Sequence, residues 1–562
     1  MELTPGPFCA ARLTRSAGVL TYVVLLLAAV LLWSAPLPAA ADGGADAALT
    51  TALNRLSHAD FSAKAAAVDQ LEKVSHPRLL PVLHALLEGN LCYRKSDRKV
   101  VIVHDVDDGY GMTDAVTAKD LGATGRRKVR RITINNEIRT ALRNAIARLS
   151  LSSSDPAVRL KAVREMLDDM SPQVAAALRQ RRKQETDADV REAIDVGLAL
   201  AGTNSADAAQ RLAAVKALSG KLNPAVRNRL AQMLNTGSDG KPLEADAGVR
   251  AAAKASIAAI DRKAEFYSVV QTGFFGLSLG SVLLLAGIGL AITFGVMGVI
   301  NMAHGEMMML GAYTTYVVQL LMPQHIGSSL FVAVPAAFLV SGLAGVVIER
   351  GVIRFLYGRP LETLLATFGI SLVLQQLVRT IFSPLNRSVQ TPDWMSGSLH
   401  INSALSLTYN RAYIVVFALL VFAALLLVLK KTSLGLKVRA VSQNREMAKA
   451  MGVRTGWVDA MTFGLGSGIA GIAGVALSQL TNVGPNLGQS YIIDSFMVVV
   501  FGGVGNLWGT LVGALSLGVF NKFLEPWSGA VLSKILVLVL IILFIQKRPR
   551  GLFPQKGRAA EG

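Results

Sequence analysis

Residues 301–306, Asn-Met-Ala-His-Gly-Glu, place three polar side chains between two long apolar runs. Asn301 offers both a donor and an acceptor, whereas His304 and Glu306 can carry charge. Such groups are costly at membrane level unless they reach water or a bonding partner. They could therefore line a path for a solute, or they could close the ends of two helices, and both interpretations stay open at this point.

Other side chains in the apolar half could bond a neutral solute, because an amide supplies both donors and acceptors. Each of them could equally bond across helices or cap a helix end. An amino acid would bring charges at both ends and so favour fixed ions or helix termini, and this half has few ions. With the residues above, the candidates for the pathway or gate are Asn301, His304, Glu306, Gln375, Gln376, Asn482 and Asn506.

No motif indicates catalysis. Gly276–Gly280 has the spacing of a hydrolase nucleophile elbow, but it lies in an apolar helical run instead of a strand, a turn and a helix. His304–Glu306 lacks the second histidine of a metalloprotease helix, and the sequence has no Walker-type phosphate loop and no zinc-like spacing of Cys and His. We predict a protein that is not an enzyme, with no metal and no cofactor, so another subunit would bind any ATP.

The elements that position these side chains differ between the two halves of the chain. The 562 residues are 52% hydrophobic and 17% charged, with a mean hydropathy of +0.44. Only 29 Lys, Arg, Asp and Glu lie in 266–562, against 63 in 42–265, so the halves face different solvents. The net charge of +19 divides as +1, +7 and +11 over 1–41, 42–265 and 266–562, and membrane topology explains it without a nucleic-acid partner.

The N-terminus has the order of a secretory signal peptide, which we expect to span residues 1–41. Arg12 and Arg15 precede the apolar run Gly18–Trp33, and Ala39–Ala41 follows it as a cleavage site. An uncleaved membrane anchor is the alternative, and both would export the chain from residue 42 onward. A single cysteine remains after the expected signal, which excludes an internal disulfide.

Residues 42–265 alternate apolar and charged residues at helical spacing, so we expect a mainly helical domain on the periplasmic side. Four segments have an Asp or Asn, which would begin a helix, three residues before the Val of a Val-Arg pair. These segments resemble HEAT-type helical repeats. The β-rich runs Val100–Val103 and Val129–Ile134 are joined by an acidic loop and predict an inserted β-hairpin. The four repeat segments are Asp155–Arg159, Asp187–Arg191, Asn223–Arg227 and Asp246–Arg250.

Residues 266–562 contain nine long apolar runs, most of which could span a bilayer as helices. The run 491–504 is short, so we expect eight or nine transmembrane helices, and an all-α fold with a polytopic membrane domain. The nine runs lie at about 270–298, 306–322, 328–348, 362–382, 412–429, 458–480, 491–504, 507–524 and 530–546.

Basic residues indicate the orientation, because they collect in short cytoplasmic loops. They cluster after the third, fifth and last runs, at 350–359, 430–454 and 547–558. Residue 265 then lies outside the inner membrane, and the C-terminus lies in the cytoplasm. The polar break at 301–306 falls near the cytoplasmic end of the first span, where we expect it to cap two helices at the inner mouth of the pathway.

The loop Gly435–Val453 is the best candidate for binding a partner protein. It predicts a short helix with Met447 and Met451 on one face, which could dock into a groove of the partner. Because the loop is basic, an amphipathic helix lying on membrane lipid is the alternative. The candidate coupling residues are Gly435, Arg439, Ala440, Glu446, Ala448, Met451 and Gly452.

Four segments together resemble the permease subunits of branched-chain amino acid ABC transporters, and the resemblance covers nearly all of residues 266–556. Several separate motifs in the right order make it specific. Within that family, a long exported N-terminal extension resembles the urea-transporter permease. The four segments are Gly298–Glu306, Gly435–Ala440, Ala448–Val453 and Phe501–Asn506.

The resemblance implies a heteromeric importer in the bacterial inner membrane. Its other parts would be a second permease, two cytoplasmic ATP-binding subunits and a periplasmic solute-binding protein, with Gly435–Val453 resting on an ATPase. We expect transport of urea, with a branched-chain amino acid or a short amide as the alternative solute. A membrane-anchored periplasmic scaffold or sensor is the alternative of another class.

Overall fold

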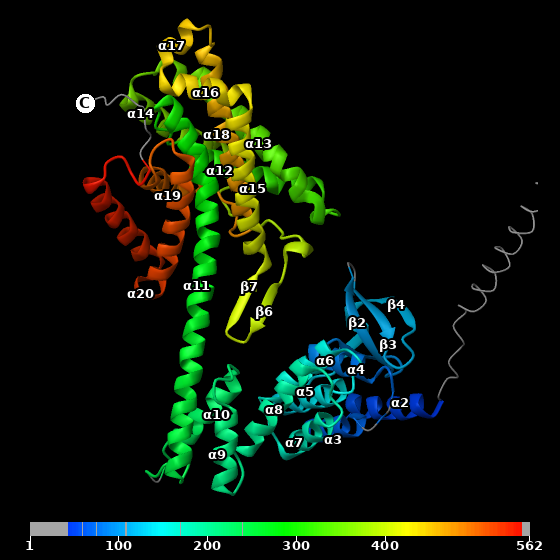
Figure 1. Ribbon diagram of the computed structural model, residues 1–562. Coiled ribbons are helices and arrows are strands. Elements are labelled where there is room, and N and C mark those ends of the chain that lie inside the picture. Colours follow the sequence, from blue (N-terminus) through cyan, green and yellow to red (C-terminus); the bar gives the residue numbers. More distant parts are fainter. Residues whose placement is uncertain are drawn as a thin grey trace, which may run out of the picture. The chain divides into compact units, whose positions relative to one another are not determined.

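The computed structural model describes residues 43–553, apart from 59, 73, 75, 107–108, 169 and 239. The expected signal peptide lies outside this range, as do the basic residues after 553. Within the range the chain forms two compact units, one ending at Ala217 and the other beginning at Leu218 (Figure 1). Both units are mainly helical.

Along the chain of the first unit, one group of helices precedes a sheet and another group follows it. The helices are α2 (Gly43–His58), α3 (Phe61–Glu72), α4 (Leu79–Glu88), α5 (Asn136–Ser150), α6 (Pro156–Met166), α7 (Pro172–Arg182), α8 (Ala188–Gly202) and α9 (Ala208–Ala217). Apolar residues at helical spacing, such as Leu49, Leu53 and Leu56 of α2, pack with Leu83 of α4 and Leu142 of α5 in a closed core. A second core joins α5, α6, α7 and α8.

The sheet has five antiparallel strands in the order β4-β3-β2-β1-β5. They are β1 (Leu91–Arg94), β2 (Val100–Val106), β3 (Gly109–Asp114), β4 (Asp120–Thr124) and β5 (Val129–Arg131). The predicted hairpin between β2 and β5 is wrong, because β1 lies between them and places Cys92 opposite both Val101 and Arg131. Glycines hid β3 and β4 from the sequence pattern, since Gly is depleted in strands.

The Asp and Asn residues that begin the four repeat segments all cap their helices with a side-chain oxygen. In three of these segments the Arg, for example Arg159, donates to the carbonyls five and six residues earlier. The fourth, Arg227, instead pairs with an aspartate. Asp207 and Arg211 repeat the same arrangement, and the pattern missed them because Gln210 stands where the other segments have Val.

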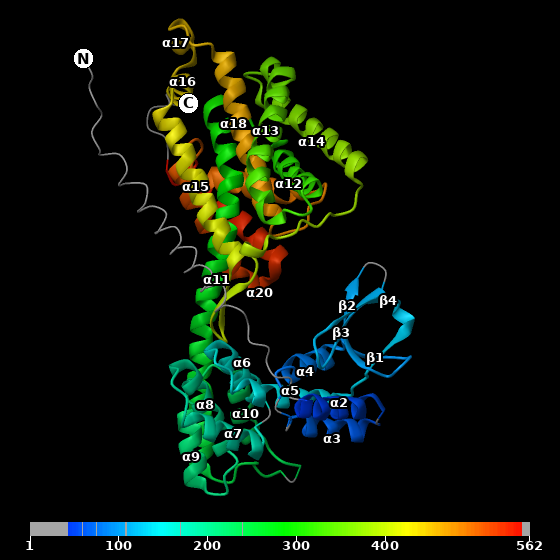
Figure 2. The same cartoon turned by 90° about the vertical axis from the view of Figure 1, so that its right-hand side faces the viewer.

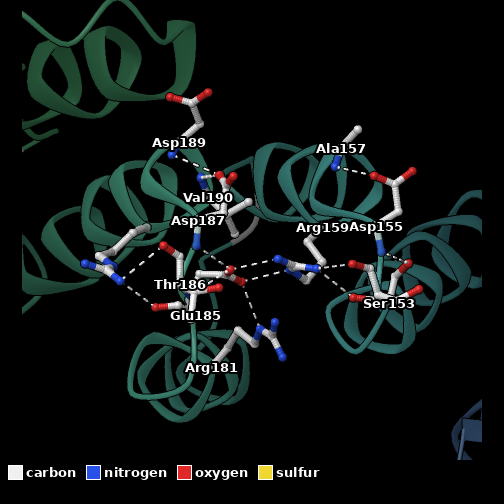
Figure 3. A network of polar contacts seen from close by, with 12 residues as sticks. Ser153, Asp155, Ala157, Arg159, Arg181, Glu185, Thr186, Asp187, Asp189 and Val190 are labelled. Atoms are coloured by element: carbon white, nitrogen blue, oxygen red, sulfur yellow. Dashed lines mark hydrogen bonds and ion pairs between the residues drawn. The ribbon is translucent and has the colours of Figure 1, made fainter.

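Glu185 collects the polar contacts of this region (Figure 3). Its buried carboxylate accepts two hydrogen bonds from Arg159, at 2.9 and 2.8 Å, and one from Arg181 at 3.0 Å. The backbone N–H groups of Thr186 and Asp187 donate to it as well. The hydrogen bonds from Arg159 are the main reason why the pKa of Glu185 is lowered to about 2, although burial opposes the shift.

The second unit is a helical bundle with one small hairpin. Its elements are α10 (Pro224–Leu234), α11 (Ala247–Met297), α12 (His304–Leu321), α13 (Ile326–Gly351), α14 (Pro360–Phe382), β6 (Ser398–Asn402), β7 (Leu405–Thr408), α15 (Tyr409–Lys431), α16 (Ser433–Gln443), α17 (Arg445–Ala450), α18 (Thr455–Ser478), α19 (Leu487–Gly502) and α20 (Leu507–Lys547). Figures 1 and 2 show α16 and α17 at one end of this bundle and α14 at its edge.

Every apolar run predicted in this half is helical, and the last two runs are the arms of α20 on either side of Gly529, whose φ of 78° bends the helix. By length and composition, six of the described helices can cross a membrane. The expected eight or nine spans are not reached by this measure, because α12 and α19 are excluded and α20 counts once. The six are α11, α13, α14, α15, α18 and α20.

Helix α11 runs for 51 residues and passes through residue 265 without interruption. The boundary between the charged half and the apolar half, which the charge pattern predicts there, therefore lies inside a helix and not in a loop. The beginning of α11 packs against α10, and its part from Gly276 to Met297 is largely buried against other helices of the bundle.

Helix α18 lies at the centre of the bundle and contacts α11, α12 and α13. At Gly466 its backbone touches Gly289 of α11, and at Gly471 it touches Gly311 of α12, so a Cβ at any of these positions would overlap backbone atoms. Small residues at such crossings let membrane helices approach closely. Glycine therefore serves close packing at these two crossings.

Candidate functional site

The polar break at 301–306 lies beside the buried C-terminal part of α11. After Met297 the chain runs back along the bundle, and the Nε2–H of His304 donates to the Ala286 carbonyl at 2.9 Å. Ala286 precedes the end of α11 by eleven residues, which is about 16 Å of helix. The break does lie where the first span turns into the next helix, as expected, but His304 lies deeper along α11 than the sequence suggested. The helix α12 begins inside the bundle because the six residues between Met297 and His304 return the chain to this depth.

Three predicted residues of the break are buried, with at most 1% of Asn301, His304 or Glu306 exposed. The Oδ1 atom of Asn301 accepts the N–H of Ala303 at 3.0 Å and so closes the turn before α12. The bond does not cap either helix, because the N-cap of α12 is Ala303, which makes no side-chain cap bond, and α11 ends at Gly298 with a backbone bond to Phe294. The ring of His304 carries a second nitrogen, Nδ1, that has no partner among the described residues.

Glu306 is bonded by α14, a helix that follows it by more than fifty residues. Its Oε1 accepts from the Ser371 hydroxyl at 2.9 Å and from the Gln375 amide at 2.7 Å. The other carboxyl oxygen has no partner within the described part of the chain. The structure thus brings two predicted residues, Glu306 and Gln375, into one polar cluster.

Helix α14 contacts this cluster through a row of polar side chains spaced four residues apart, which we call the polar stripe. Thr367 accepts the N–H of Met302 at 3.1 Å, which places the stripe against the turn as well as against Glu306. The sequence reasoning missed the hydroxyls because isolated Ser and Thr are common in apolar helices, although their spacing of four residues would have placed them near one another. The buried members of the stripe are Thr363, Thr367, Ser371 and Gln375.

The stripe ends at Arg379, one further step of four residues along α14. Its guanidinium donates to the Oδ1 atom of Asn486 at 2.8 Å. Asn486 lines a pocket of about 310 Å³ near the ends of α14 and α18 that lie away from α16 and α17. The lining residues are Asn386, Thr481, Asn482, Gly484, Asn486, Leu487, Ser490 and Tyr491.

The remaining pathway candidates lie apart from the cluster. Asn482 belongs to the pocket just described. Gln376 is exposed on α14 and is not in the buried stripe. Asn506 caps α20 by accepting the N–H groups of Trp508 and Gly509, both at 3.1 Å. For Asn506 the geometry favours the capping interpretation over contact with a solute.

The pocket and the polar break meet where two helices begin. Gly488 in the first turn of α19 touches Gly305 in the first turn of α12, and a Cβ on either would overlap the backbone of the other. The chain on the pocket side is fixed by an antiparallel bridge, in which Arg387 and Val483 exchange backbone hydrogen bonds of 2.7 and 2.8 Å. Leu487, which lines the pocket, thus comes directly before a residue that touches the 301–306 turn.

The predicted coupling segment forms α16 and α17. Asn444 caps α17, and the guanidinium of Arg445 bonds the carboxylate of Asp459 on α18 and the hydroxyl of Tyr357. The side chain of Asp459 is almost fully buried. Among the predicted residues, Gly435 and Ala448 are buried, Ala440 is half-buried, and the exposed ones are Arg439, Glu446, Met451 and Gly452.

Comparisons with known proteins place most of the second unit. The family model for the branched-chain amino acid transport system permease component matches residues 273–545. The chain is 31% identical over 299 residues to the high-affinity branched-chain amino acid transport permease LivH of Salmonella typhimurium, over 51% of this chain and 96% of the relative. It is 30% identical over 297 residues to BraD of Pseudomonas aeruginosa, over the same shares. No solved structure is significantly similar to the chain.

Proposed function

Since this chain belongs to the family of branched-chain amino acid transport permeases, we propose that it is the membrane-spanning permease subunit of an ATP-driven importer. It is a transport protein of the membrane, and ATP hydrolysis belongs to separate subunits. Its partners are a second permease, two cytoplasmic ATP-binding subunits and a periplasmic solute-binding protein.

In the proposed topology, a signal peptide exports residues 42–265 as a HEAT-like periplasmic domain, and the C-terminus lies in the cytoplasm. The long helices cross the bilayer, and α12, α19 and the two arms of α20 raise the number of crossings to eight or nine. The short α12 and α19 begin within the bundle, where Gly305 and Gly488 touch. Irregular backbone is tolerated at membrane depth when protein surrounds it or when it lines a cavity.

The solute is urea or a short amide. The observation that carries this choice is the buried stripe on α14, of which the Thr367 hydroxyl, the Ser371 hydroxyl and the Gln375 amide bond residues of the 301–306 turn. Such groups suit a neutral solute that both donates and accepts hydrogen bonds. The alternative solute is a branched-chain amino acid, which the printed names of the relatives favour.

The uptake experiment compares cells with and without the gene. We expect cells without the gene to lose ATP-dependent uptake of labelled urea and to keep their leucine uptake unchanged. The reverse result, lost leucine uptake with unchanged urea uptake, would make the chain an amino acid permease. Copurification of the chain without any ATP-binding subunit would support the scaffold or sensor function instead.

The segment Gly435–Val453 rests on an ATP-binding subunit and passes on its motion. Met447 and Met451 are 60% and 78% exposed, as expected for a face that docks on a partner. Because Arg445 joins α17 to Asp459, a movement of the segment reaches α18, which packs against α11 and α12.

This docking is tested with Met451→Glu, which puts a charge on the exposed apolar face. We expect the variant to lose the copurifying ATPase and to lose uptake. The control is Lys449→Gln, an exposed polar residue of the same helix. If Met451→Glu retains both the ATPase and uptake, the docking surface lies elsewhere.

A further inference from the structure

The pocket near the ends of α14 and α18 is lined without any charged side chain. It holds three asparagines, a threonine, a serine and a tyrosine in about 310 Å³. Asn386 comes from the segment after α14, whereas Asn482 comes from the loop between α18 and α19. Two segments far apart in the sequence thus present primary amides to one space, and the Arg387–Val483 bridge holds these segments together.

The amides of Asn386 and Asn482 make no side-chain hydrogen bond in the described part of the chain, whereas Asn486 is already engaged by Arg379. A primary amide offers two N–H donors and one carbonyl acceptor. Another amide is therefore its natural complement, since each carbonyl can accept from the other's N–H group. Such a solute can exchange hydrogen bonds with both amides, and because it is neutral it requires no counter-ion.

We propose that this pocket is the entry binding site for a neutral primary amide, with urea as the simplest occupant, held by Asn386 and Asn482. The inference rests on the proposed function and adds the place where the solute first binds. Arg379 and Asn486 stand at its border with the polar stripe, so a bound solute lies next to the Arg379 end of the stripe. Leu487 of the lining begins α19, and the next residue, Gly488, touches Gly305 of α12.

An amino acid is the competing occupant, because the pocket includes Leu487 at the start of α19. The exposed N–H groups of a helix start attract a carboxylate. The neutral lining gives the ammonium group of an amino acid no carboxylate partner, which is why we favour the amide. The experiment below includes leucine for this reason.

The test uses the complete transporter with single cysteines at the pocket. Thr481→Cys and Ser490→Cys, at two exposed lining residues that are not assigned to hold the solute, are made separately with Cys9 replaced by Ala, and Cys92 is kept because it is fully buried. A membrane-impermeant methanethiosulfonate reagent labels each thiol with and without urea. At ten times the urea Kd, occupancy should slow labelling by about tenfold. Leucine should not slow it.

The matched control is Ser388→Cys, which lies on the same segment as Asn386, is exposed and does not line the pocket. Its labelling should not respond to urea. As a second measurement, Asn386→Leu and Asn482→Leu should raise the KM for urea uptake with little change in the maximal rate.

The outcomes separate the two proposals. If the wild type takes up urea but urea protects neither cysteine, the entry site is refuted and the proposed function stands. If the wild type takes up leucine and not urea, the proposed solute is wrong, and the amide site falls with it. Protection of both cysteines by urea alone supports the site.

Discussion

Replacing Glu306 by Ala would leave the Ser371 hydroxyl and the Gln375 amide buried without their acceptor. The loss of a buried partner costs about 1–3 kcal/mol. Glu306→Gln keeps an acceptor oxygen in the same place. We therefore expect Glu306→Ala to lower the melting temperature of the purified transporter clearly more than Glu306→Gln does, as measured by scanning fluorimetry.

The control for this comparison is Glu362→Ala, which removes a half-exposed carboxylate at the start of α14 and should change little. Equal melting temperatures for Glu306→Ala and Glu306→Gln would mean that the cluster does not hold α14. Uptake then separates the two roles left open by the sequence. A stable Glu306→Gln variant with reduced uptake would indicate contact with the solute, whereas unchanged uptake would leave a structural role.

Glu185 makes the stability of the first unit depend on pH. Its pKa is lowered from 4.5 to about 2 in the folded chain, mainly by the hydrogen bonds from Arg159. A lowered pKa contributes stability that is fully present above about pH 4.5 and is lost as the pH falls toward 2. We expect protection of α6 and α8 against hydrogen exchange, corrected for the intrinsic rate, to fall over this range.

Glu185→Gln should flatten this pH dependence and reduce the protection already at neutral pH, because Arg159 then lies buried without a carboxylate. Glu165→Gln provides the control, since Glu165 belongs to an exposed pair with Lys161 at 4.0 Å. An unchanged pH dependence in Glu185→Gln would assign the effect to another carboxylate.

Among single residues, the sequence alone located part of the site. The types of Asn301, His304 and Glu306 marked a polar element because charge and apolar surroundings conflict in any fold. The partners Thr367 and Ser371 were missed, since a hydroxyl in a helix usually bonds its own backbone. Their contact with the break depends on how α14 packs, which no local pattern contains.

Among the elements, the start of α19 is the most sensitive to volume. A Cβ on Gly488 would overlap the backbone of Gly305, and a backbone atom cannot rotate out of the way as a side chain can. We expect Gly488→Ala to separate α12 from α19 and to abolish uptake, measured together with the amount of protein in the membrane.

Gly369→Ala is the matched control, because Gly369 lies inside α14 with nothing within 4 Å of an added Cβ. Alanine should even favour that helix by about 1 kcal/mol. If Gly488→Ala transports like the wild type, the close approach of the two helix starts is not needed for transport.

Helices were predicted better than strands. Each apolar run of the second half is helical, because a run of this length satisfies its backbone only within itself. In contrast, the pairing of β2 and β5 was predicted wrongly, since the short β1 had been overlooked and β-pairing joins distant segments. The start of α12 inside the bundle also escaped prediction, because the length of a turn does not say how deep it returns.

For the molecule as a whole, the comparisons separate the two units. A share of 51% of this chain already accounts for 96% of LivH, and the family model begins at residue 273. The relatives thus have almost no sequence left to match the first unit. The packing of the bundle also comes from within the second unit, where α18 joins α11, α12 and α13.

We therefore expect the second unit to transport without the first. Joining residue 41 directly to Leu218 keeps the expected signal peptide and all helices of the second unit. The shortened chain should reach the membrane and retain the maximal rate of urea uptake, because the stripe on α14 and the pocket at Asn482 are intact. Uptake over a range of urea concentrations, normalised to the amount of protein in the membrane, measures this. A change confined to KM would assign the first unit to solute delivery, whereas loss of uptake at every concentration, with normal amounts of protein, would make that unit part of the transport machinery itself.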